Sequence, residues 1–144
     1  MVHLFMASNQ TGSILILQAY ERMVTFVSRS GLNVLTDRLP GHDISAHQLA
    51  DVLITSIQAE FEHNLSQQIY LPENTWQVIS DMKDQQIFIL RQLKLNLPEN
   101  APASSLLSVI QTFLEADPNA SLQPMVLEML KKEARQLLLP SQNT

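Results

Sequence analysis

The sequence contains no cysteine among its 144 residues. This absence excludes disulfide bonds, a thiolate metal site and a cysteine nucleophile. It also removes one argument for an oxidising compartment, where small proteins often depend on disulfides for their stability. The chain must therefore rely on a hydrophobic core, and 45% hydrophobic residues is an ordinary fraction for a globular protein.

Glycine is scarce as well, with 3 residues against 7 prolines. The tight hairpin turns of a many-stranded sheet usually need glycine where φ is positive. So few glycines disfavour a sheet, and the runs of β-branched residues are also short. We therefore expect an all-α fold, and a length of 144 residues suits one domain that spans the whole chain.

Positive charge is in the minority, because 9 Lys and Arg face 14 Asp and Glu, for a formal net charge of −5. This mild acidity weakens the case for binding a polyanion, so no nucleic-acid partner is expected. The hydrophobic runs at 2–7 and 14–17 are too short for a signal core or a membrane span. We expect a cytoplasmic protein, membrane-associated only if a native N-terminal span is missing from this chain.

The clearest helix signal lies at residues 44–70. Ser45 and Gln48 have the spacing of a capping box, in which each side chain bonds the backbone N–H of the other residue. Beyond this cap, apolar residues recur every three or four positions, at Ala50, Leu53, Ile54, Ile57, Phe61 and Leu65. This spacing forms one apolar face without a Gly or Pro, so we predict one long helix over 45–70.

The same signals predict the remaining elements. They are a loose lead-in at 1–12, a first helix at 14–28, a short piece at 32–39, a helix at 72–96, two C-terminal helices at 104–116 and 121–139, and a tail at 141–144. The expected N-caps are Ser13, either Ser104 or Ser105, and Ser121, and the expected stop of the first helix is Gly31. The predicted fold is a long antiparallel hairpin of residues 45–70 and 72–96, packed by the first helix and the two C-terminal helices.

Two stretches, LQAYERM at 17–23 and AEFEHNLSQQIY at 59–70, resemble a family of small, uncharacterised helical proteins from Bacteroidetes-type bacteria. The resemblance covers roughly residues 17–96. It implies a helical hairpin, often behind an N-terminal membrane span, and this chain departs from that pattern by having no such span. The family implies no activity and no site residues.

Glu60 and His63 form an E-x-x-H motif, whose i, i+3 spacing places both side chains on one side of a helix. Di-iron carboxylate bundles use two such motifs and two further glutamates. The sequence contains one motif, so we expect no bound metal and no cofactor, although a symmetric dimer could bring two copies together. The favoured interpretation of His63 is a hydrogen-bonded histidine on the surface or at an interface.

Glu60, His63, Asn64 and Gln67 form a polar strip beside the apolar face, and Tyr70 adds hydrogen-bonding capacity near its end. Such strips are usually solvated flanks, and the alternative is that these five residues bind a ligand or a partner. A second polar cluster contains His42, Asp43, His47 and Asp51. We interpret it as capping and surface residues, because zinc needs three or four convergent ligands.

The segment 87–97 is apolar on more than one side of its predicted helix, so it must be covered on several faces. The C-terminal helices or a second subunit could cover it, and a homo-oligomer is therefore expected. We find no phosphate loop, nucleophile elbow or H-E-x-x-H motif, so we do not expect an enzyme. The favoured hypothesis is a non-catalytic helical interaction or scaffold protein that self-associates. The alternative is a helical bundle that holds a small ligand or metal near Glu60 and His63.

Overall fold

The computed structural model describes residues 2–38 and 43–140, with side chains from residue 11 onward. Within these ranges the chain is helical, and its β-structure is limited to one isolated bridge between Ser45 and Pro102. The elements are α1 (Val2–Arg29), α2 (Leu32–Arg38), α3 (Ala46–His63), the 3₁₀ helix η1 (Leu65–Tyr70), α4 (Glu73–Leu95), α5 (Ala103–Ala116) and α6 (Gln123–Leu138). The predicted tail at 141–144 lies outside the described residues.

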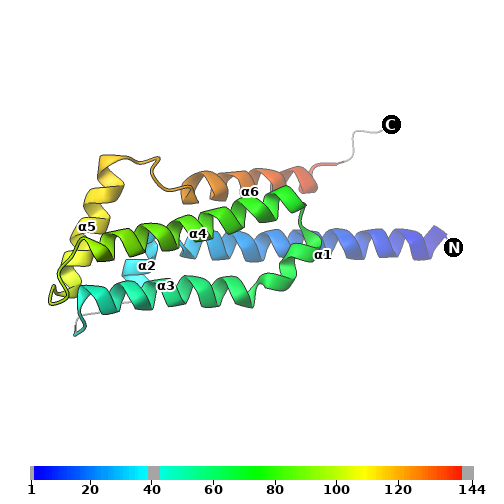
Figure 1. The fold of residues 1–144 in the computed structure, drawn as a ribbon. Helices are drawn as coiled ribbons and strands as arrows, with labels where there is room; N and C mark the ends of the chain where they lie inside the picture. The colour runs from blue at the N-terminus through cyan, green and yellow to red at the C-terminus, as the bar shows by residue number, and fades with distance from the viewer. Residues whose placement is uncertain (1, 39–42, 141–144) are drawn as a thin grey trace.

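The all-α prediction is confirmed. Helices α3 and α4 form an antiparallel hairpin joined by η1, and α1 and α6 lie side by side along it (Figure 1). Helix α5 crosses one end of the bundle and packs on α3 (Figure 1). Among the described residues, no helix is both long and apolar enough to cross a membrane.

The first helix is longer than predicted. Helix α1 begins at Val2, so the prediction of a loose lead-in over 1–12 and a cap at Ser13 is wrong for the described part of that segment. The run at 8–13 is polar, but it contains no proline that would interrupt a helix. Its one glycine, Gly12, faces open space within α1. The first turns of α1 project beyond the ends of the other helices (Figure 1).

Helix α1 ends close to Gly31, as predicted, but not through a left-handed glycine, because Gly31 has no positive φ. Distant side chains instead satisfy the last carbonyls of the helix. Arg38 donates to the Arg29 carbonyl (2.9 Å), Gln123 to that of Val27 (3.0 Å), and Gln86 to that of Ser30 (2.8 Å). These three bonds connect the C-terminus of α1 to α2, α6 and α4.

The capping box at Ser45 is confirmed, with both of its hydrogen bonds present. The prediction of one helix over 45–70 is wrong, because α3 ends at His63 and η1 follows. The α-helix gives way to the 3₁₀ helix at Asn64. The side-chain amide of Asn64 donates to the Glu60 carbonyl (2.8 Å), and its backbone N–H donates to the Phe61 carbonyl (3.0 Å). Competition of this kind by a local side chain breaks the α-helical hydrogen-bond ladder.

The two C-terminal helices form as expected, with different starts. Neither Ser104 nor Ser105 caps α5, since Pro102 is the N-cap residue and no side-chain bond is made there. The N-cap residue of α6 is Leu122, so the prediction of a cap at Ser121 is wrong by one position. Ser121 precedes the cap and accepts from the backbone N–H of Gln123 (3.2 Å). Its hydroxyl also donates to the buried Gln86 (2.8 Å), so it ties α6 to α4.

The core accounts for most of the apolar surplus at 87–97. Ile87, Ile89 and Leu90 are buried, and both α5 and α6 pack against α4. Phe88 and Leu95 remain 61% and 71% exposed. The C-terminal helices therefore cover most of this segment, and α4 presents two separate apolar side chains to solvent.

Candidate functional site

A shallow groove of about 600 Å³ runs between α1 and the end of α3. We call it the α1–α3 groove. Its lining contains Glu60, His63 and Asn64 of the predicted polar strip. The other lining residues are Ala59 from α3 and Arg22, Thr25, Phe26 and Arg29 from α1.

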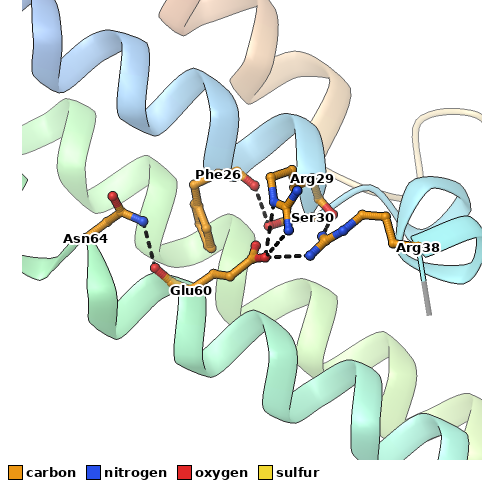
Figure 2. A network of polar contacts seen from close by, with 6 residues as sticks. All are labelled: Phe26, Arg29, Ser30, Arg38, Glu60 and Asn64. Atoms are coloured by element: carbon orange, nitrogen blue, oxygen red, sulfur yellow. Dashed lines mark hydrogen bonds and ion pairs between the residues drawn. The ribbon is translucent and has the colours of Figure 1, made fainter.

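Glu60 lies at the centre of a charged network beside this groove (Figure 2). Its Oε1 atom accepts from Arg29 Nε (3.1 Å) and Nη2 (2.8 Å) and from Arg38 Nη2 (2.5 Å). Arg38 also donates to the Arg29 carbonyl at the end of α1. One carboxylate oxygen thus joins α3 to both α1 and α2.

The pKa of Glu60 reflects two opposing effects. Partial burial raises the pKa of the carboxyl, whereas hydrogen bonds from Arg29 and Arg38 and the positive charges of both side chains lower it. The second effect is larger, so the pKa lies below its ordinary value of 4.5. Glu60 is therefore ionised at neutral pH and is a poor proton donor there.

Asn64 is buried and bonds a third arginine, Arg22, which also lines the groove. Arg22 Nε donates to Asn64 Oδ1 (3.1 Å), and Asn64 Nδ2 donates to the Glu60 carbonyl (2.8 Å). The helix break at Asn64 is thus held by a side chain from α1. Figure 2 shows the Glu60 side chain reaching toward the end of α1, while the amide of Asn64 bonds the backbone of Glu60.

The structure separates the predicted strip into two parts. Glu60, His63 and Asn64 line the groove, and His63 is exposed there. Gln67 is buried in η1, where its amide donates to Ser66 Oγ (3.4 Å), and Tyr70 is half-buried against the core. Neither Gln67 nor Tyr70 lines the groove.

Sequence reasoning missed the three arginines. Arg22 and Arg29 are seven residues apart, which places them on one face of a helix. That spacing was a readable signal, but nothing local connects either residue to Glu60. Arg38 lies in a different helix, and only the folded chain brings it to the same carboxylate.

In the described part of the chain, no three His, Asp or Glu side chains converge as a metal site requires. In the second polar cluster, His47 Nε2 lies 2.8 Å from the Leu97 carbonyl, and Asp51 pairs with Lys94 (2.8 Å). His42 lies outside the described residues, and Asp43 is exposed.

A second surface lies where α6 ends beside α1. Three leucines at the end of α6 are exposed: Leu137, Leu138 and Leu139. On α1, Ile14 is 56% exposed, and a depression of about 200 Å³ is lined by Ser13, Ile14, Ile16, Leu17, Leu137 and Leu138. We call this surface, residues 13–17 with 137–139, the apolar end.

The chain matches the model of a family of unknown function, DUF7935, over residues 2–137. It belongs to that family. The match extends well beyond the stretch 17–96 that the sequence resemblance covered, and it includes α1 and both C-terminal helices. Searches of curated proteins and of solved structures found no match.

Proposed function

We propose that this member of a family of unknown function is a non-catalytic helical interaction protein that self-associates through the apolar end. The proposal rests on the exposed leucines at the end of α6, which lie beside Ile14 of α1. Leu138 is 65% exposed and Leu139 is 59% exposed. Monomers rarely expose contiguous apolar patches larger than a few hundred Å², and the largest patch on a protein is often an interaction surface.

The projecting turns of α1 support the same conclusion. Most helical stability in proteins comes from tertiary packing of one face of the helix. In Figure 1 the start of α1 extends past α6 and η1, so none of the other described helices lies beside it. A second copy that packs on the apolar end would support this extension.

A two-fold dimer fits this surface, because the apolar end combines exposed leucines with a shallow apolar depression. The exposed Leu138 and Leu139 of one copy can contact the depression between α1 and the end of α6 of the other, and the reverse contact follows by symmetry. Closed two-fold dimers are the commonest oligomers and use one self-complementary patch. Among the described residues, the apolar end contains no charged side chain that would oppose this contact.

Light scattering coupled to size exclusion tests the proposal. Wild-type protein at tens of micromolar should have the mass of a dimer, and Leu138→Glu should shift it to a monomer, because a carboxylate would be desolvated at the contact. Met125→Glu is the matched control, since Met125 is 61% exposed at the other end of the same helix. Dissociation by both variants, or a monomeric wild type, would contradict the proposal.

A second candidate function is a binding protein that holds a small ligand beside Glu60 and His63. The α1–α3 groove favours it, because the groove combines the charged groups of Arg22, Arg29 and Glu60 with the exposed apolar side chain of Ala59. Chemical-shift mapping with a library of small fragments tests it. Fragments should shift the amides of groove residues, and a library that leaves those amides unchanged would exclude the function.

A further inference from the structure

We propose that the α1–α3 groove binds an oxyanion, the phosphate or carboxylate group of a small molecule. The inference rests on the second proposed function and names the class of its ligand. The guanidinium groups of Arg29 and Arg38 bond the Glu60 carboxylate, and that of Arg22 bonds the neighbouring Asn64. Arg22, Arg29 and Glu60 line the groove, and Arg38 adjoins it through Glu60. Three cations beside one carboxylate leave a local excess of two positive charges.

This excess contrasts with the rest of the chain. The protein has a formal net charge of −5, and its other arginines are Arg91 and Arg135. Three of the five arginines thus converge on a site formed by α1, α2 and α3. The general field of an acidic protein repels anions, so any attraction must come from this local arrangement.

The hydrogen bonds leave donor capacity on all three guanidinium groups. Each guanidinium carries five N–H donors. Arg22 uses its Nε–H on the neutral Asn64, and no carboxylate of the described residues lies within 4.0 Å of its charged nitrogens. Arg29 and Arg38 both bond the same oxygen, Glu60 Oε1, so two cations share one anionic atom.

The surrounding contacts hold these arginines in place for a ligand. Glu60 fixes Arg29 and Arg38, and the buried Asn64 fixes Arg22. Planar guanidinium groups match carboxylate and phosphate oxygens in two-point geometry, and prior ordering lowers the entropic cost of binding.

Glu60 has two opposing effects on anion binding. It orders Arg29 and Arg38, but its negative charge competes with a bound anion. Glu60→Gln should therefore raise the affinity for an anion while it weakens the ion pairs. A cluster with a purely structural role would show no such gain.

The experiment is a titration of backbone amide shifts with inorganic phosphate and, separately, with acetate, at constant ionic strength in sodium chloride. Amides at residues 22–29, 38 and 59–64 should shift and saturate. Arg22→Gln should weaken binding by about 2- to 5-fold, as expected for one exposed charge pair. Lys132→Gln, an exposed cation on α6 away from the groove, should leave it unchanged. Saturation by phosphate alone or by acetate alone identifies which oxyanion the groove accepts.

Two results would overturn the inference. One is the absence of saturating shifts in wild type and in Glu60→Gln with both anions. The other is an equal loss of affinity in Arg22→Gln and Lys132→Gln, which would indicate general charge attraction. If uncharged fragments shift the groove amides while neither anion does, the binding function stands and the oxyanion inference fails.

Discussion

The hydroxyl of Tyr20 donates a hydrogen bond of 2.8 Å to Oε1 of Glu133, although 113 residues separate the two in the chain. Thr75 Oγ1 donates to the same oxygen (2.7 Å), so α1, α4 and α6 meet at one carboxylate. Burial of the Tyr20 side chain, and then the hydrogen bond to Glu133 and its negative charge, raise the pKa of Tyr20 to about 12. This contact joins the first and last helices next to the apolar end.

The raised pKa predicts a fall in stability at alkaline pH. Because the folded state holds the phenolic proton more tightly than the unfolded chain, the contribution is fully present below pH 10 and is lost as pH rises from 10 to about 12. Tyr20→Phe should cost about 1–2 kcal/mol at neutral pH, and its difference from wild type should shrink over that window. Urea unfolding at several pH values measures this, with Tyr70→Phe as the control. A constant difference from neutral pH to pH 12 would refute the assignment.

The Glu60 network predicts a loss of stability in acid. The pKa of this carboxyl is lowered in the folded state, so its contribution is present above 4.5 and disappears as pH falls through the lowered pKa. Glu60→Gln should reduce stability by about 1 kcal/mol at neutral pH, since the ion pairs are partly exposed, and by less in acid. Glu62→Gln, an exposed neighbour on α3, should follow wild type throughout in thermal melts. If both variants have the same melting temperature at every pH, the ion pairs of Glu60 do not contribute to stability.

The capping box predicts a difference between two serines. Ser45→Ala should cost about 1 kcal/mol, because it removes the bond to the backbone N–H of Gln48. Ser104→Ala should cost little, since Ser104 lies at the start of α5 and makes no capping bond. Chemical denaturation of both variants compares them directly. A loss of stability for Ser104→Ala as large as that for Ser45→Ala would show that capping does not explain the effect.

The buried Gln86 predicts a larger cost. Its amide donates to the Ser30 carbonyl and its Oε1 accepts from Ser121, and the side chain is fully buried. Gln86→Met keeps the volume but removes the donor to the Ser30 carbonyl and the acceptor of the Ser121 hydroxyl proton, so the free energy of unfolding should fall by about 2–3 kcal/mol. Gln92→Met, on an exposed position of α4, serves as the control. A Gln86→Met protein as stable as this control would mean that water replaces both bonds.

The features that the sequence predicted well depend on residues close together in the chain. The capping box needs Ser45 and Gln48, and the apolar period of α3 needs neighbours three or four positions apart. The all-α fold and the hairpin follow from such local signals. The helical content of the described residues agrees with them.

The features that it missed depend on distant partners. The break after His63 is held by Arg22, 42 residues away from Asn64, and the end of α1 is capped by Gln86 and Gln123. The candidate site shows the same limit, because Glu60 was visible as part of a polar strip while Arg29 and Arg38 were not. In the same way, Gln67 looked like a surface residue but is buried in η1. Periodicity could not show that the α-helix stops before it.

In the proposed dimer, two copies of the chain meet at the apolar end. The chain has no native cysteine, so one engineered cysteine can carry a single spin label. Labels at Gln136→Cys, beside the exposed leucines, and at Ser104→Cys, on α5 across the bundle, can be compared by pulsed dipolar spectroscopy at tens of micromolar. We predict a defined distance between copies for the label at 136, a longer or unresolved one at 104, and loss of both signals on dilution with unlabelled protein. Absence of dipolar coupling between labels at residue 136 would contradict a dimer formed through the apolar end.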